Sequence, residues 1–102
     1  MTPSDEDRNL SLTSIVAATK DQVSSDVGGE TILLSMESAM YYGLDSVGSR
    51  IWELVRDPIA VVEIRDAIAR EYDVDLEQCQ SDVLAFLQEL AAKGLIEVRN
   101  DR

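Results

Sequence analysis

The sequence predicts a single α+β domain of winged helix-turn-helix type, with a three-stranded antiparallel sheet followed by three helices. Residues 22–44 alternate apolar and polar side chains in short runs separated by turn residues. Residues 46–92 change to the three-to-four spacing of amphipathic helices. The chain has 102 residues, of which 45% are hydrophobic, and this is enough for one core. The order of strands and then helices is the outline of a winged domain.

The N-terminal end of the chain is polar and acidic. Pro3 is followed by Ser4 and by the acidic run Asp5, Glu6 and Asp7. We therefore expect residues 1–14 to form a disordered acidic segment and residues 15–102 to form the folded domain. The apolar run at residues 15–18 leaves two alternatives open, a short strand or part of a loop.

A glycine pair predicts the first hairpin. Gly28 and Gly29 stand between two strand-like runs, and a type I′ turn needs positive φ at both central residues. In the run that follows, Ile32 and Leu34 lie on one face of the strand and Leu33 lies on the other.

The third strand is expected to form a free edge of this sheet. After a turn at residues 37–39, Tyr41 and Tyr42 point to opposite faces. One structural explanation is that one tyrosine packs under the helices while the other covers the outer face. However, residues 39–44 contain no Lys or Pro, which usually protect a free edge. This omission favours docking of an extended peptide by strand addition.

Three helices follow the sheet. Asp45 or Ser46 can cap the first helix, which should end at Asp57-Pro58, and Asp75 can cap the third in a capping-box variant. A short terminal strand is expected at residues 95–98. A buried face is expected at Val47, Ile51, Leu54 and Val55 in the first helix, and the same period recurs at Val61, Ile64, Ile68 and Tyr72 in the second. The apolar positions of the third helix are Leu76, Cys79, Val83, Phe86, Leu87, Leu90 and Ala91.

Composition argues against catalysis and against a bound cofactor. The chain has no histidine and a single cysteine, which excludes disulfides, zinc sites and imidazole-dependent triads. Cys79 lies on the apolar period of the third helix, so we interpret it as a core residue. Residues 73–77 resemble the start of a calcium loop, but Gln78 and Leu84 stand where the loop needs Gly and Glu. We expect no enzyme activity, no cofactor and no metal.

The formal net charge of −11 disfavours nucleic acids and anionic membranes as partners. In the expected recognition helix, Lys93 is the single basic residue among exposed acidic and amide side chains. No apolar run approaches the roughly 20 residues of a membrane span, and the N-terminus lacks the features of a signal peptide. A cytoplasmic protein is the expectation.

At this point the sequence resembles the PqqD-like family, the recognition elements for precursors of ribosomally synthesised and post-translationally modified peptides (RiPPs). The resemblance covers residues 23–98. One departure is Ala39, where many relatives have Gly. If this turn position requires positive φ, the alanine is strained there. The matching residues are Gly29-Glu30, Ile32-Leu33-Leu34, Tyr41-Tyr42-Gly43-Leu44, Val47-Gly48, Ile51-Trp52, Tyr72-Asp73-Val74, Asp82-Val83, Phe86-Leu87, Leu90 and Gly94-Leu95.

The resemblance implies a non-catalytic protein that binds the leader of a precursor peptide and presents it to maturation enzymes. The leader would add beside the third strand and lie against the third helix. Lasso-peptide biosynthesis, with a leader peptidase and a cyclase as partners, is the main expectation. A peptide chaperone for pyrroloquinoline quinone, working with a radical enzyme, is the alternative, and a DNA-binding regulator or a purely structural assembly subunit is less favoured. The expected peptide-binding residues are Leu33, Met40, Tyr41, Tyr42, Gly43, Asp82, Val83, Phe86, Leu87 and Leu90.

Overall fold

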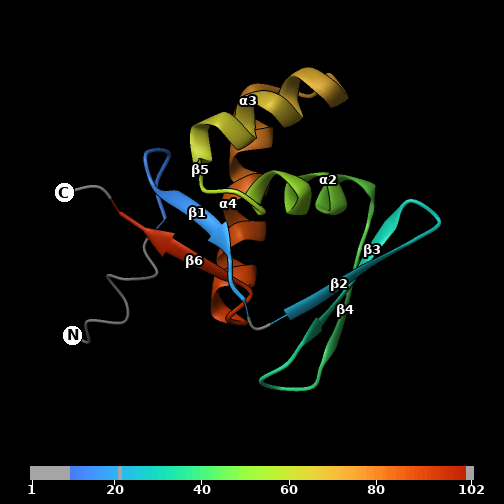
Figure 1. Cartoon of the computed structure of the whole chain (residues 1–102). Coiled ribbons are helices and arrows are strands. Elements are labelled where there is room, and N and C mark those ends of the chain that lie inside the picture. Colours follow the sequence, from blue (N-terminus) through green and yellow to red (C-terminus); the bar gives the residue numbers. More distant parts are fainter. Residues whose placement is uncertain (1–9, 21, 101–102) are drawn as a thin grey trace.

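In the part of the chain that the structure describes, three helices and two small sheets make up the fold (Figure 1). The computed structural model describes residues 10–20 and 22–100. In chain order the elements are β1 (Ile15–Ala18), β2 (Gln22–Val27), β3 (Glu30–Ser35), β4 (Tyr41–Leu44), α2 (Ser46–Val55), β5 (Ile59–Ala60), α3 (Val61–Tyr72), α4 (Leu76–Ala92) and β6 (Ile96–Arg99). The predicted three-stranded antiparallel sheet followed by three helices is confirmed.

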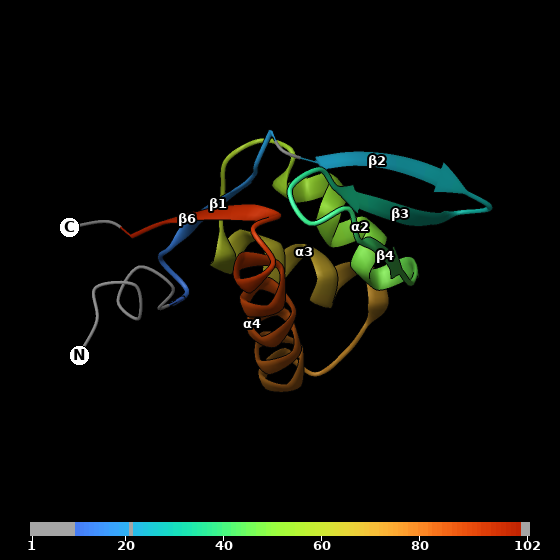
Figure 2. The same cartoon turned by 90° about the horizontal axis from the view of Figure 1, so that it is seen from below.

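The first sheet has the order β2-β3-β4, so β4 lies at an edge as predicted. Gly28 and Gly29 have φ angles of 62° and 87°, and both are in the positive range that the hairpin turn requires. The hairpin extends away from the helices, and the two views show the sheet as a projecting wing (Figures 1 and 2).

A second sheet joins distant parts of the chain. Its order is β5-β1-β6, and Val16 pairs with Ile59 on one side and with Val98 on the other. This pairing shows that residues 15–18 form a strand. Val16 is fully buried in the core, so the sheet holds the C-terminal strand against the N-terminal one.

The folded region begins earlier than residue 15. Leu10 is only 8% exposed and belongs to the hydrophobic core, and Ser14 is fully buried. The carbonyl of Ser14 accepts a hydrogen bond from the Val61 N–H at 2.9 Å. The prediction of disorder was therefore wrong for residues 10–14, because apolar Leu10 provides an anchor that the acidic composition obscured. Residues 1–9 lie outside the described residues.

Side-chain caps begin two of the helices at the predicted positions. The Asp45 carboxylate accepts the Gly48 N–H at 2.8 Å at the start of α2, and the Asp75 carboxylate accepts the Gln78 N–H at 3.1 Å at the start of α4. The Gln78 side chain donates to Asp82 at 3.0 Å and does not complete a capping box. In the described part of the chain, no helix is both long and apolar enough to span a bilayer.

The core lies where the three helices meet the inner face of β3 and the second sheet. Its largest fully buried side chains include Trp52, Leu33, Ile64 and Leu87. Each such side chain contributes roughly 1.5–3 kcal/mol relative to exposure. The core therefore holds the base of the wing sheet firmly against the helices.

We expect Ala39→Gly to stabilise the protein by about 0.5–1 kcal/mol. Ala39 has φ 58° in the turn between β3 and β4, and its Cβ costs roughly 1–2 kcal/mol there, partly offset by the greater chain entropy of Gly. Thermal unfolding should show a rise of a few degrees. Asp73 has a similar φ of 52°, but aspartate tolerates this region better, so Asp73→Gly is the matched control with a smaller effect. A lower melting temperature for Ala39→Gly would contradict this account of the turn.

Candidate functional site

The free edge of β4 offers backbone groups for hydrogen bonding. Ser35 donates its N–H to the Met40 carbonyl at 2.9 Å, and Tyr42 pairs with Leu33 in the same register. In an antiparallel ladder, alternate residues direct their N–H and C=O groups to opposite sides. Tyr41 and Gly43 therefore direct theirs away from β3, toward the open edge.

A serine hydroxyl fixes the end of this edge strand to helix α2. The Thr31 N–H donates to Ser49 Oγ at 2.9 Å, and Ser49 Oγ donates to the Leu44 carbonyl at 3.3 Å. Both hydrogen bonds are buried, where they are protected from competing water. The hydroxyl thus bridges the last rung of the ladder, and the edge is held in place before any peptide binds.

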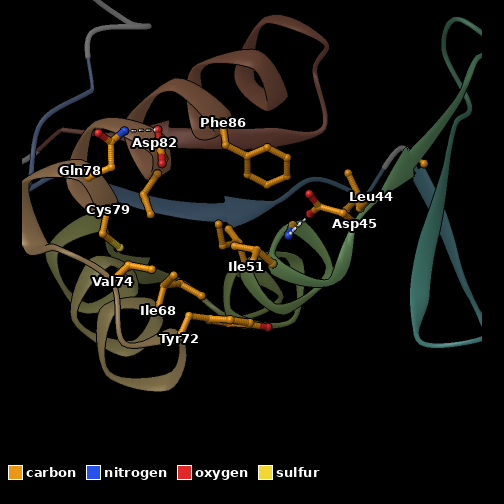
Figure 3. Close-up of a pocket in the computed structure, with 14 residues that line it drawn as sticks. Leu44, Asp45, Ile51, Ile68, Tyr72, Val74, Gln78, Cys79, Asp82 and Phe86 are labelled. Atoms are coloured by element: carbon orange, nitrogen blue, oxygen red, sulfur yellow. Dashed lines mark hydrogen bonds between the residues drawn. The ribbon is translucent and has the colours of Figure 1, made fainter.

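An apolar cleft of about 460 Å³ opens at the end of β4 (Figure 3). It lies between the start of α2, the end of α3 and the N-terminal half of α4. Such a lining suits apolar side chains of a ligand. The apolar wall consists of Leu44, Val47, Ile51, Ile68, Tyr72, Val74, Val83 and Phe86.

Carboxylate and amide groups border the cleft. Asp45, Gln78 and Asp82 line it, and its lining residues include no Lys or Arg. Gln78 donates its amide N–H to Asp82, and Asp45 holds the first turn of α2, so both carboxylates are fixed in position (Figure 3). This border favours a ligand that carries hydrogen-bond donors or positive charge next to its apolar groups.

Cys79 forms part of the cleft floor and is 3% exposed. Burial raises the pKa of its thiol above the ordinary value, and the nearby Asp82 adds to the rise. The group therefore stays protonated at neutral pH, where it behaves as a small apolar surface. The interpretation of Cys79 as a core residue is confirmed.

An ion pair fixes the end of α3 beside the cleft. Arg50 of α2 donates two hydrogen bonds to the Glu71 carboxylate, both of 2.9 Å. This contact lowers the pKa of Glu71. The ion pair is therefore fully formed at pH values above the ordinary pKa of glutamate, and it weakens as the pH falls through the lowered pKa of Glu71. The neighbouring Tyr72 donates its hydroxyl to the Ser46 carbonyl at 3.5 Å.

The expected peptide-binding residues differ in their exposure and in their position relative to the cleft. Met40 and Tyr41 are exposed outside the cleft, whereas Gly43, Asp82, Val83 and Phe86 line it. Tyr42 is half-buried on the inner face, with Lys93 Nζ 5.4 Å from its ring centroid. Tyr41 is 71% exposed, so the two tyrosines do point to opposite faces.

Three of the expected contact residues lie in the core and do not line the cleft, whereas Val83, which is 2% exposed, belongs to both. Leu33 and Leu87 are fully buried and Leu90 is 3% exposed. Their side chains support the edge strand and α4 from beneath and are not available as groove walls in this conformation. The spacing of apolar residues predicted which face of each element points inward. It could not distinguish fully buried residues from those at the edge of the core.

Several cleft residues were not expected to contact a ligand. Ile51 and Ile68 had been assigned to helix cores, and Val74 and Gln78 to a loop and a cap. Val74 is 44% exposed between two aspartates, and this isolated apolar residue was the available signal. The cleft forms where α3 ends and α4 begins, a junction that no helical period describes.

We expect Gly48→Ala to weaken ligand binding several-fold while changing stability by less than about 1 kcal/mol. A Cβ at Gly48 would lie 3.2 Å from the tip of the Phe86 ring and 3.2 Å from Asp45 Oδ1. The ring would have to move into the cleft, whereas the higher helix propensity of Ala, worth about 1 kcal/mol, would offset the crowding. Thermal unfolding and peptide titration of the same variant measure the two effects. Unchanged affinity would show that the Phe86 position is unimportant.

The comparisons with known proteins agree with this geometry. Residues 30–96 match the profile of the PqqD family, coenzyme PQQ synthesis protein D. The structure of TbiB1 in complex with the TbiA(beta) leader peptide has 40% sequence identity and a TM-score of 0.76, and the match covers 83% of this chain and 99% of that one. No curated protein matches the chain.

A second solved structure shares the fold. It is the solution structure of the PqqD portion of Methylobacterium extorquens PqqCD, described as a stand-alone RiPP recognition element. Its identity is 22% and its TM-score is 0.74, with 90% of this chain and 98% of that chain covered. The family profile spans most of the chain, and TbiB1 is 40% identical over 83% of it. The chain described here belongs to the PqqD family.

Proposed function

We propose that this protein binds the leader segment of a ribosomally synthesised precursor peptide by strand addition to β4. The observation that carries the proposal is the free edge at Tyr41 and Gly43 directly beside an apolar cleft. A strand on this edge would place alternate side chains toward the cleft, and this combination gives both affinity and specificity. The likeness to a chain that was solved with its own leader peptide supports the same function.

The protein acts as a binding module that presents the leader to maturation enzymes and performs no chemistry itself. The cleft lining offers no activated nucleophile, because its thiol is buried with a raised pKa. We propose a leader peptidase and a cyclase of lasso-peptide biosynthesis as the enzymes served. The resemblance of the Tyr41–Leu44 and Ile51-Trp52 pieces to lasso-associated relatives favours this assignment over pyrroloquinoline quinone maturation.

Apolar anchors should dominate the affinity. Each backbone hydrogen bond to the edge contributes a net of about 0.5–1.5 kcal/mol, and a leader that is disordered when free must lose conformational entropy. One apolar side chain buried in the cleft contributes roughly 1.5–3 kcal/mol. Two such anchors contribute roughly 3–6 kcal/mol, compared with about 1–3 kcal/mol for two hydrogen bonds to the edge, and the hydrogen bonds also set the register.

A fluorescence-anisotropy titration tests the proposal. The probe is the labelled leader of the short precursor peptide encoded nearest to this gene. We expect saturable binding that survives moderate salt and is lost when the apolar residues of the leader are changed to Ala. A scrambled leader of the same composition is the control. Equal binding of the scrambled peptide, or no binding by folded protein, would refute leader recognition.

A further inference from the structure

The outer face of the β2-β3-β4 sheet, turned away from the helices, has an unusual polarity. On β3, the buried positions are Thr31, Leu33 and Ser35, whereas the outward positions include Ile32 and Leu34. A sheet with one solvated face normally places its apolar residues inward and its polar residues outward. Two of the three buried positions are polar here, and two of the three outward positions, Ile32 and Leu34, are apolar, with Glu30 the third.

The strand register extends this pattern across all three strands. Val23, Leu34 and Tyr41 form one row, because Leu34 pairs with both of its neighbours. Residues directly opposite each other in an antiparallel sheet point to the same side. Val23 is 53% exposed and Tyr41 71%, so the row is open to solvent. We define the outer face by Val23, Val27, Ile32, Leu34 and Tyr41.

The charge around the outer face limits what can cover it. Residues 21–49 contain no Lys or Arg, and the acidic residues on the three strands and their turns are Asp26, Glu30 and Glu37. A second copy would bring another net charge of −11 against this acidic border, which opposes pairing. The complementary surface is an apolar patch bordered by basic side chains on a different protein.

The outer face is continuous with the edge that takes the leader. Tyr41 belongs to the outer face through its side chain and to the open edge through its backbone groups. A leader strand added to β4 would become a fourth strand, and its outward side chains would form a further row beside Tyr41. A partner on the outer face would therefore contact the sheet and the leader together.

We propose that the outer face docks the enzyme that acts on the bound leader, through an apolar patch with a basic border, and that the bound leader completes this docking surface. The inference rests on the proposed function for its leader-dependent part. Since coupling between two ligands is reciprocal, the leader should raise the affinity for the enzyme by the same factor by which the enzyme raises the affinity for the leader. The enzyme would then bind the leader-bound protein more tightly than the protein without leader.

The test uses Val23→Thr/Ile32→Thr in the full chain. Threonine keeps the β-branched shape that strands favour and removes apolar surface from the outer face. Leu76→Gln is the matched control, because Leu76 is 48% exposed at the start of α4, away from the sheet. The probe is the purified leader peptidase encoded beside the precursor, titrated by biolayer interferometry against immobilised protein, with and without saturating leader. Leader affinity is measured separately by anisotropy.

We expect the double variant to lose at least tenfold in peptidase affinity while its leader affinity stays within about twofold of wild type. Leu76→Gln should match wild type in both, and leader should strengthen peptidase binding to wild type several-fold. Unchanged peptidase binding by the double variant would overturn the proposal. The proposal would also be overturned if wild type sedimented as a dimer and the double variant as a monomer, because a second copy of the chain would then cover the outer face. Failure of the leader to bind would refute the proposed function. The peptidase affinities of wild type and double variant without leader would still show whether the outer face binds the peptidase.

Discussion

Gly43→Pro should reduce leader affinity by about 10- to 100-fold and leave the fold intact. The substitution removes the N–H that Gly43 directs to the open edge and places a ring where the leader backbone must approach. A lost hydrogen bond with the accompanying clash is worth roughly 1–3 kcal/mol. Proline is tolerated on an edge strand when its missing N–H faced solvent, so the β3–β4 ladder should survive. Anisotropy titration measures the affinity and circular dichroism the fold.

Gly43→Ala is the matched control for this result. A Cβ built at Gly43 meets nothing within 4 Å, and the N–H is retained. We expect leader affinity within about twofold of wild type, which corresponds to less than about 0.5 kcal/mol. If alanine weakened binding as much as proline, the effect would come from side-chain space, and backbone pairing at this edge would be refuted.

Phe86→Ala should weaken leader binding by about 30-fold or more. The Phe86 ring lies on the cleft wall (Figure 3), and its tip would be 3.2 Å from a Cβ built at Gly48 in the first turn of α2. Aromatic side chains in such positions are typical of binding hot spots, where truncation costs about 2 kcal/mol or more. The titration is interpretable only on folded protein, which the fluorescence of the buried Trp52 and a thermal melt monitor in parallel.

The control for Phe86 is Leu84→Ala on the same helix. Leu84 is also half-buried and packs against the core, but it does not line the cleft. It should lose stability without losing leader affinity at temperatures where the protein stays folded. Equal losses of affinity in both variants would show that binding follows general destabilisation of α4 and not the cleft wall.

Local signals in the sequence predicted the main elements of the fold. The Gly28-Gly29 pair specified the hairpin, and Asp45 and Asp75 specified the starts of two helices, because each acts within a few residues. The β5-β1-β6 sheet was missed because β5 has only two residues and its pairing joins segments more than 40 positions apart. The packing of Leu10 depends on the same distant partners.

The candidate site was predicted in part for a related reason. The edge position of the third strand followed from the predicted strand order, and the structure places β4 at an edge of its sheet. The helical period could not separate Phe86, which lines the cleft, from Leu87, which is fully buried one position later. That distinction depends on how far α4 stands from β4, a property of tertiary packing.

The measurement that tests strand addition most directly is residue-resolved amide hydrogen exchange with and without the leader. Tyr41 and Gly43 direct their N–H groups to the open edge, whereas Tyr42 pairs with Leu33. Leader binding should strongly slow exchange at Tyr41 and Gly43 and leave the already protected Tyr42 nearly unchanged. Saturating leader that leaves both edge amides exchanging at their free rates, with protection appearing elsewhere, would contradict strand addition to β4.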